Sequence, residues 1–231
     1  MKTLGILGGM SWESTAIYYR LLNQAVAARC GGLHSAPLVL ASVDFETIAA
    51  RQRADDWAGA AAQLGRAGAG LRAAGAGALL IATNTLHKVA DEVAARAGLP
   101  LLHIADATAA ALRAAGVRRA AFLGTRFSME DRGIVIERLE RAGTAVFVPE
   151  ADDRALMHRV IFEELCRGVI RDATRAEVVA LIERQAARGA DAVVLGCTEI
   201  GLLIDEACCP LPCFDTTVLH AAAAVEWMLE T

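Results

Sequence analysis

The sequence contains few of the residues on which several common enzyme chemistries depend. Its lysines are Lys2 and Lys88, and neither lies in a motif typical of the Schiff-base lysine that a pyridoxal-phosphate enzyme needs. The six cysteines are irregularly spaced, and no CxxC, HExxH or CxxC…HxxxH pattern occurs. There is no Walker A sequence either. We therefore expect chemistry that uses neither a metal ion nor a bound cofactor.

Charge and hydropathy exclude further classes of protein. The formal net charge is −4 and no run of basic residues occurs, so we expect no nucleic-acid partner. No apolar stretch reaches the roughly 18 residues of a membrane span. The first residues lack the features of a signal peptide, which predicts a cytoplasmic protein with reduced thiols. With 55% hydrophobic residues in 231, the chain has ample material for a folded core.

Short apolar runs alternate with longer amphipathic ones along the whole chain. The runs predict strands near residues 3–7, 38–42, 78–82, 101–103, 119–123, 145–148 and 192–195. Helices are predicted near residues 13–29, 55–74, 87–97, 105–115, 130–141, 153–166, 176–188 and 217–229. Glycine ends several of these helices, at Gly75, Gly98, Gly116, Gly143 and Gly189. Continuous apolar strands separated by helices are typical of an α/β fold with parallel sheets covered on both faces.

The two halves of the chain contain similar segments, which we call the internal repeat. Residues 75–85 match residues 189–199 in character, and residues 6–9 match 122–125 more weakly at nearly the same offset. Every strand–helix unit resembles every other to some degree, but agreement at two places favours a duplication. We therefore predict two pseudo-symmetric α/β domains, residues 1–103 plus 210–231 and residues 104–209, with the active site in the cleft between them.

Four polar turns each follow a predicted strand and precede a helix. They are residues 8–11, 83–85, 124–125 and 196–199. Backbone N–H groups and helix dipoles at such turns suit a carboxylate or phosphate. The first turn lacks the G-x-G-x-x-G spacing of a dinucleotide site. A small anionic molecule is the expected substrate.

Cys197 is the strongest candidate for a reactive group; the alternative is an ordinary buried cysteine. At the end of a strand that opens a helix, we expect its pKa to fall from about 8.5 toward neutrality. Its equivalent in the first half is Thr83. Two small heteroatom side chains on opposite sides of a cleft suit a reaction that removes a proton from one face of a carbon and returns one to the other. Racemisation of an amino acid is such a reaction.

Three segments together resemble the aspartate/glutamate racemase family. They are residues 7–15 (LGGMSWEST), residues 83–87 (TNTLH) and residues 196–200 (GCTEI), and the resemblance covers essentially the whole chain. It implies a two-domain pseudo-symmetric fold, no cofactor, a homodimer and two catalytic cysteines. The second of these falls on Cys197, whereas the first falls on Thr83. This pair of threonine and cysteine resembles the pair in a subgroup of racemases that act on L-aspartate and L-glutamate.

The resemblance also implies a set of substrate-binding residues. The α-carboxylate and ammonium groups would be held by Asn84, Thr85, Thr125 and Thr198, the distal carboxylate would face Gln52, and Met10 would serve as a backbone anchor. The loop around Gln52 also carries Arg51 and Arg53, either of which suits a carboxylate or is a solvated loop charge.

The threonine at position 83 leaves alternatives open. A hydroxyl is too weak an acid to act as an ordinary base near neutral pH, so the two directions of reaction should differ. His87 could supply a proton to it, or could simply cap a helix or lie on its surface; Cys166 could line the cleft. Two other functions remain: a single-cysteine decarboxylase or isomerase of small dicarboxylates, and a non-catalytic homologue that only binds amino acids. The sequence does not distinguish aspartate from glutamate as substrate.

Overall fold

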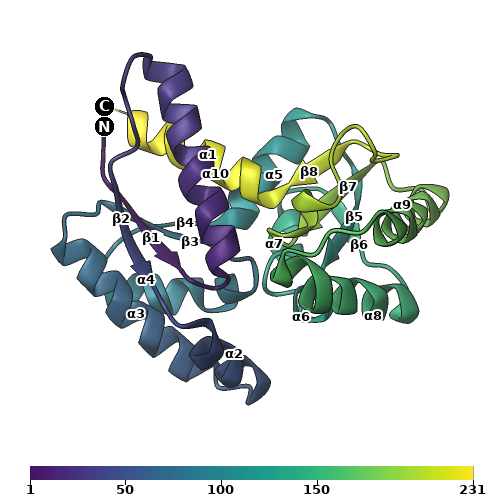
Figure 1. Cartoon of the computed structure of the whole chain (residues 1–231), viewed down its shortest axis with the longest axis horizontal. Coiled ribbons are helices and arrows are strands. Elements are labelled where there is room, and N and C mark those ends of the chain that lie inside the picture. The colour runs from purple at the N-terminus through teal and green to yellow at the C-terminus, as the bar shows by residue number, and fades with distance from the viewer. Residues whose placement is uncertain (231) are drawn as a thin grey trace. The chain divides into compact units, whose positions relative to one another are not determined.

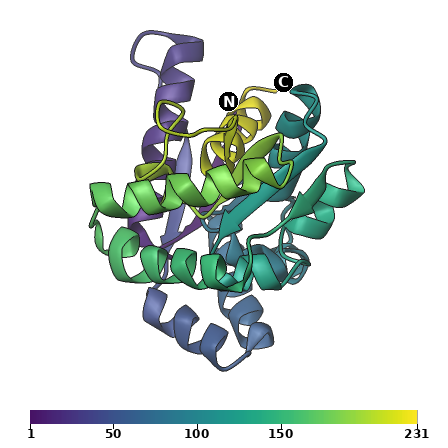
Figure 2. The same cartoon turned by 90° about the vertical axis from the view of Figure 1, so that its right-hand side faces the viewer.

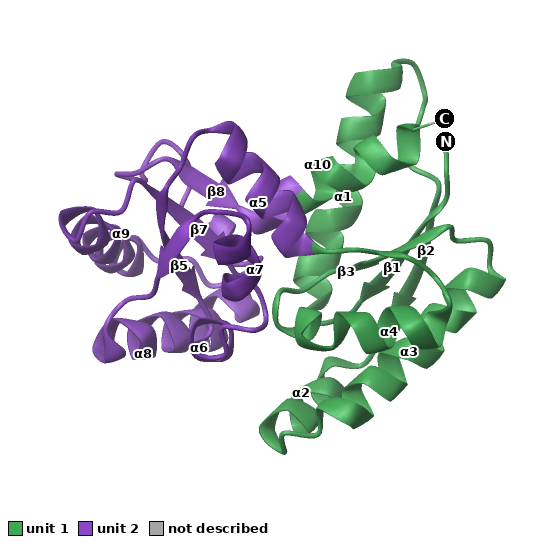
Figure 3. Cartoon of the chain, turned by 180° about the vertical axis from the view of Figure 1, so that it is seen from behind, with its two compact units in different colours: residues 1–103, 220–231 green, residues 104–219 purple. Residues whose placement is uncertain are grey.

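The chain folds into two compact units in the computed structural model, which describes residues 1–230. Unit 1 comprises Met1–His103 together with the C-terminal segment from His220, and unit 2 comprises Ile104–Leu219 (Figure 3). The chain thus returns to unit 1 at His220, later than the predicted return at residue 210. The reason is that a short strand between the two positions, β8 (Cys213–Asp215), pairs with the sheet of unit 2.

Unit 1 is built on a four-stranded parallel sheet in the order β2-β1-β3-β4. Its strands are β1 (Leu4–Gly8), β2 (Leu38–Ser42), β3 (Ala78–Ile81) and β4 (Leu101–Leu102). Its helices are α1 (Trp12–Cys30), α2 (Phe45–Arg53), α3 (Trp57–Ala73), the 3₁₀ helix η1 (Thr85–Val89), α4 (Ala90–Ala97) and most of α10 (Thr216–Leu229). Helices α1 and α10 cover one face of the sheet, and α2, α3 and α4 cover the other (Figure 1).

Unit 2 repeats this plan with a parallel sheet in the order β6-β5-β7-β8. Its other strands are β5 (Arg119–Gly124), β6 (Ala145–Phe147) and β7 (Ala192–Gly196). Its helices are α5 (Ile104–Ala114), α6 (Arg126–Glu130), α7 (Ile136–Arg141), α8 (Ala151–Arg159), the π-helix η2 (Val160–Glu164), the 3₁₀ helices η3 (Leu165–Arg167) and η4 (Ile200–Leu202), and α9 (Asp172–Ala187). Figure 2 shows these helices from a second direction.

The equivalent strand orders confirm the predicted α/β fold with two similar halves. In each unit the first strand lies between the second and the third, so the chain crosses over twice in the same way. The glycines predicted to end helices all have positive φ, from 65° at Gly98 to 100° at Gly143. Over residues 1–230, no helix combines the length and the apolar character that crossing a membrane requires.

Three local predictions were wrong. The segment predicted as one helix over residues 130–141 is helical only from Ile136, because α6 ends at Glu130 and a turn precedes α7; in this turn Asp131 accepts a hydrogen bond from the N–H of Gly133. Helix α2, capped by Asp44, and strand β8 were not predicted. Both are short, and α2 has a single fully buried apolar residue, Ile48, so neither shows a clear hydrophobic period.

Helices α3 and α4 approach closely because glycines on α3 face α4. A Cβ atom placed on Gly68 would lie 2.8 Å from Cβ of Ala97. Gly70, on the same helix, is exposed, and a Cβ there would meet nothing within 4 Å. Substituting alanine at Gly70 therefore tests only the preference of a helix for alanine over glycine, whereas the same change at Gly68 also tests the packing of α3 against α4.

We predict that Gly70→Ala stabilises the protein by roughly 0.5–1 kcal/mol, because alanine loses less backbone entropy in a helix. Gly68→Ala gains the same helical term but pushes α4 away, and we expect a net loss of about 1–3 kcal/mol from overpacking. Urea unfolding of the two variants measures both effects. Equal free energies of unfolding for the two variants would contradict this packing.

Candidate active site

In unit 1, three of the predicted site residues follow the central strands directly. Strands β1 and β3 pair with Leu7 opposite Ile81, so the turns that follow them lie at the same edge of the sheet. Asn84 and Thr85 are buried after β3, and Thr83, just before them, is partly buried. This is the carboxyl edge of a parallel sheet, where ligands bind in open α/β folds.

The turn after β1 belongs to the same edge. Gly9 has φ +88°, and a Cβ there would lie 2.1 Å from the carbonyl oxygen of Val43, so only glycine fits. Met10 is buried and packs in one hydrophobic cluster with Ile48 of α2 and Leu86 of η1. The cluster thus joins the turn after β1, helix α2 and the turn after β3.

Gln52 lies in the last turn of α2, one turn beyond Ile48, and is partly buried. The arginines on either side of it have other partners. Arg51 forms an ion pair with Asp56 and donates to Gln63, and Arg53 pairs with Glu46 on the exposed side of the helix. The interpretation of these arginines as solvated loop charges fits better than direct binding of a substrate carboxylate.

In unit 2, the remaining predicted residues lie at the equivalent edge. Gly124 of β5 pairs with Gly196 of β7, so Thr125 and Cys197 follow neighbouring strands at the same level. Thr125 caps α6 by accepting a hydrogen bond from the N–H of Ser128 at 3.3 Å. Cys197 and Thr198 are both buried, with 8% and 5% of their surfaces exposed.

A carboxylate that the sequence prediction did not assign lies at the centre of this turn. Glu199 is only 4% exposed. The thiol of Cys197 donates a hydrogen bond to its Oε2 at 3.0 Å, and the hydroxyl of Thr198 donates to the same oxygen at 2.6 Å. Cys166 of η3 also donates to Glu199. A buried carboxylate therefore accepts hydrogen bonds from two thiols and a hydroxyl.

The predicted fall in the pKa of Cys197 is wrong. Burial raises the pKa of this thiol well above its usual value, and the negative charge of Glu199 raises it further. The hydrogen bond from the backbone of Glu199 lowers it, but this effect is smaller. The helix after Cys197 is η4, of three residues, so no long helix dipole opposes the burial. At neutral pH the thiol is protonated.

Cys166 shares this environment. Burial, followed by the charge of Glu199 and a hydrogen bond to it, raises the pKa of the Cys166 thiol to about 12. The thiol is therefore a hydrogen-bond donor to Glu199 rather than a nucleophile.

His87 is not on a helix surface, because only 3% of it is exposed. Its Nδ1 lies 2.8 Å from the carbonyl oxygen of Thr83, and the rings of His103 and His220 pack beside it. Burial lowers the pKa of His87 well below its usual value, and the two neighbouring rings lower it further. The imidazole is therefore neutral at pH 7, and it is not a ready proton donor.

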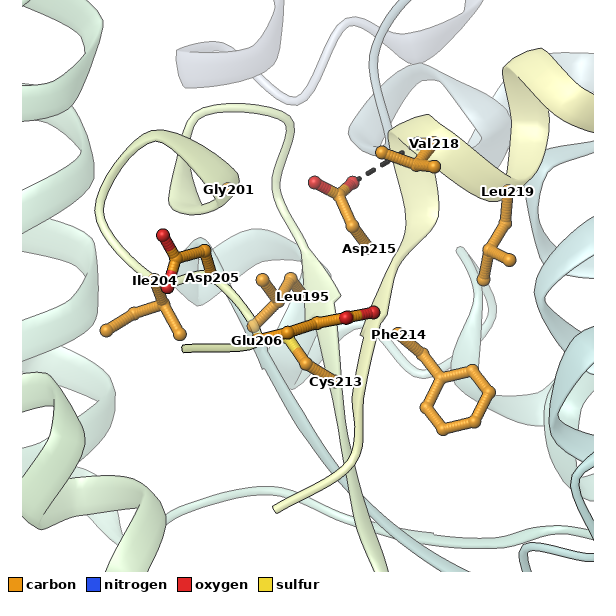
Figure 4. Close-up of a pocket in the computed structure, with 10 residues that line it drawn as sticks. All are labelled: Leu195, Gly201, Ile204, Asp205, Glu206, Cys213, Phe214, Asp215, Val218 and Leu219. Carbon is orange, nitrogen blue, oxygen red and sulfur yellow. Dashed lines mark hydrogen bonds between the residues drawn. The ribbon is translucent and has the colours of Figure 1, made fainter. Parts of the chain in front are cut away.

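A separate pocket of about 310 Å³ lies in unit 2 beside β7 and β8. Figure 4 shows its lining residues, among them Asp205, Glu206, Cys213 and Asp215. None of the predicted site residues lines it. Among residues 1–230 no group of three or more His, Cys, Asp or Glu side chains is placed to hold a metal ion.

The structure thus gathers the predicted residues into two groups, one on each sheet edge. Met10, Thr83, Asn84 and Thr85 belong to unit 1, with Gln52 on the adjoining helix. Thr125, Cys197 and Thr198 belong to unit 2. The sequence contained a signal for Glu199, since it is an acidic residue within an otherwise apolar segment, residues 192–203.

Comparisons with known proteins identify the family and the fold of the chain. The model of a family described as Asp/Glu/hydantoin racemase matches residues 7–224. A Yersinia pestis protein provisionally described as an Asp/Glu racemase is 46% identical, with a TM-score of 0.93 and 100% of each chain covered. An aspartate racemase homologue from Pyrococcus horikoshii OT3 is 31% identical, with a TM-score of 0.85 and the same full coverage. Picrophilus torridus aspartate racemase shares the fold at 21% identity and a TM-score of 0.76, over 99% of this chain and 94% of that one. The resemblance predicted from the sequence is confirmed.

We predict that Glu199→Gln lowers the pKa of the Cys197 thiol, because the substitution removes the negative charge that helps to raise it. The measurement is the rate of alkylation by iodoacetamide as a function of pH, followed by mass spectrometry of the peptide that contains Cys197. Glu163→Gln, on an exposed residue of η2, is the matched control. If the midpoint for Cys197 were the same in wild type and Glu199→Gln, Glu199 would not control this thiol.

Proposed function

Because the chain belongs to the Asp/Glu/hydantoin racemase family, we propose that it interconverts the L and D forms of aspartate or glutamate without a cofactor. That the chain is an enzyme of the amino-acid racemase class is given by the family itself. The substrate and the roles of individual residues are the proposal. The observation that carries it is the hydrogen bond of 3.0 Å between the Cys197 thiol and the buried carboxylate of Glu199.

In the proposed reaction Cys197 is the base toward the L enantiomer. Its thiol proton passes to Glu199 Oε2, which later releases it to solvent, and the sulfur takes a proton from Cα of the substrate. The electron pair of the broken C–H bond stays on the substrate as a carbanion, delocalised into the α-carboxylate. The thiolate forms only during the reaction, because burial and the charge of Glu199 disfavour it at rest. The positive charge of the substrate ammonium group offsets this penalty.

Thr83 is proposed to act on the other face of Cα. Its hydroxyl donates a proton to the carbanion, which completes the inversion, and is then reprotonated from solvent. Thr83 and Cys197 follow equivalent strands, β3 and β7, in the two halves of the fold. The equivalence supports opposed roles for the two side chains. A hydroxyl accepts a proton much less readily than a thiolate does, so removal of hydrogen from the D enantiomer should be the slower process.

The remaining predicted residues are proposed to bind the substrate. Their positions at the carboxyl edges of the two sheets suit an amino acid with its α-carboxylate near the turns. Asn84 and Thr85 would serve from unit 1, and Thr125 and Thr198 from unit 2. Gln52 would face the distal carboxylate, and Met10 would contribute its backbone. The homodimer and the cytoplasmic location predicted from the sequence stay predictions.

Proton NMR of L- and D-aspartate and of L- and D-glutamate in D₂O tests the proposed reaction. We expect loss of the Cα–H signal with formation of the opposite enantiomer. Release of CO₂ would indicate a decarboxylase instead. Binding without exchange or CO₂ release would indicate a homologue that only binds amino acids.

We predict that Cys197→Ala reduces Cα–H exchange of L-aspartate or L-glutamate by roughly 10²–10⁴-fold, the usual contribution of a general base. The change removes one small side chain and should leave the fold intact. Cys30→Ala, at an exposed cysteine of α1, is the control and should exchange like wild type. Exchange retained in Cys197→Ala would exclude Cys197 as the base.

The asymmetry between thiol and hydroxyl gives a second prediction. Thr83→Cys places an ionisable thiol of similar size at position 83, so it should raise exchange of the D enantiomer much more than that of the L enantiomer. Equal amounts of the two enantiomers must still form at equilibrium, because mirror images have equal free energies. Rates measured separately from pure L and pure D substrate give the comparison. If Thr83→Cys left D exchange unchanged, Thr83 would not be the opposing group.

A further inference from the structure

We propose that His87 is a positioning residue that fixes the place of Thr83, and that a buried group formed by Tyr18, His103 and His220 holds His87 in turn. The inference rests on the role proposed above for Thr83. It concerns only unit 1, to which all of these residues belong.

The backbone hydrogen bonds of η1 explain why a side chain, rather than a backbone N–H, binds the carbonyl of Thr83. The N–H of His87 donates to the carbonyl of Asn84 at 3.1 Å, which is the i→i−3 bond of a 3₁₀ helix. In an α-helix the same N–H would donate to the carbonyl of Thr83. The imidazole takes over that bond, with Nδ1 at 2.8 Å from the Thr83 carbonyl oxygen. The ring therefore satisfies this carbonyl while Thr83 stays outside the helix, directly beyond the end of β3.

The donor in this bond is fixed by chemistry. A carbonyl oxygen only accepts, so Nδ1 of His87 carries the hydrogen and donates it. In the neutral ring Nε2 is then the unprotonated nitrogen. This tautomer matches the low pKa that burial gives the ring.

Two rings pack against the ring of His87. The ring of His103, just after β4, lies with its centroid 4.6 Å away at an interplanar angle of 60°. The ring of His220, on α10, lies 5.6 Å away at 66°. His220 is itself fixed at both nitrogens: Nε2 donates to the carbonyl of Leu102 at 2.8 Å, and Nδ1 accepts from the hydroxyl of Tyr18, on α1, at 2.9 Å.

The same residues mark the places where the chain leaves and re-enters unit 1. His103 is the last residue before unit 2, and His220 is the first after it. The group therefore ties the turn that carries Thr83 to both connections of unit 1. Because burial also lowers the pKa of His220, to about 4, the ring of His220 stays uncharged across the neutral range.

Loss of this support should slow conversion to the D enantiomer more than exchange of the L enantiomer. A misplacement of about 1 Å in a catalytic group can reduce a rate by about 10²-fold. Loss of the bond from His87 would displace Thr83, whereas Cys197 lies in unit 2 and receives its hydrogen bonds there. Exchange of the L enantiomer in D₂O needs Cys197, but its conversion to the D enantiomer also needs Thr83. The ratio of conversion to exchange therefore reports on Thr83.

A pair of nearly isosteric variants separates the hydrogen bond from the volume of the ring. His87→Asn keeps an N–H donor at about the position of Nδ1, and His87→Leu has the same branching without a donor. Starting from L-aspartate or L-glutamate in D₂O, we expect His87→Leu to lower conversion by about tenfold or more relative to exchange. His87→Asn should restore most of that ratio.

A reduction of conversion and exchange by the same factor in His87→Leu, or identical ratios in the Asn and Leu variants, would overturn the inference. If His87→Leu does not fold, Tyr18→Phe decides, because it removes only the hydroxyl that fixes His220. A lower ratio in Tyr18→Phe supports the inference, and an unchanged ratio overturns it. An inactive wild type would instead contradict the proposed function.

Discussion

The protonation of the Cys197 thiol depends on its burial and, after that, on one buried carboxylate to which the thiol is hydrogen-bonded. An ionised carboxylate removed from water costs several kcal/mol unless hydrogen bonds replace its hydration. Glu199 receives such bonds from Cys197, Thr198 and Cys166. Burial, with the charge of this carboxylate added to it, keeps both thiols protonated. The resting site therefore contains a protonated thiol with a carboxylate oxygen 3.0 Å from its sulfur, and the proposed reaction needs that oxygen to take the thiol proton.

The repeated topology makes the turns that carry Thr83 and Cys197 equivalent, although the groups around them differ. Equivalent strands end in equivalent turns, so in the internal repeat Thr83 corresponds to Cys197 and Thr85 corresponds to Glu199. The thiol has a carboxylate two residues later. The hydroxyl has no carboxylate there; it has a neutral imidazole four residues later, bound to its own carbonyl. In the proposed reaction the first of these groups moves a proton, and the second holds a weak acid in place.

Much of this architecture could be predicted from the sequence. The parallel sheets could be predicted from the continuous apolar runs and from the glycines that end helices. The similarity of residues 75–85 to residues 189–199 predicted that the two halves are equivalent. Short elements escaped prediction because α2 and β8 have too few buried residues to show a period.

The environment of the site residues was less predictable. The pKa of Cys197 was misjudged because a position at the end of a strand that opens a helix suggested a helix dipole beside the thiol, whereas the side chain is buried beside a carboxylate. The support of His87 depends on Tyr18 and His220, which are 202 residues apart, and no local pattern shows such a contact. Contacts of this kind depend on the tertiary fold rather than on any motif.

Exchange of Cα–H by Glu199→Gln tests most directly whether Glu199 takes the proton of Cys197. The measurement is the rate in D₂O at neutral pH with L-aspartate or L-glutamate, beside wild type and the exposed control Glu163→Gln. Glutamine cannot accept the thiol proton, so the account predicts a fall of roughly 10²–10⁴-fold, even though the thiol itself becomes easier to ionise. Exchange in Glu199→Gln as fast as in wild type, or faster, would contradict it.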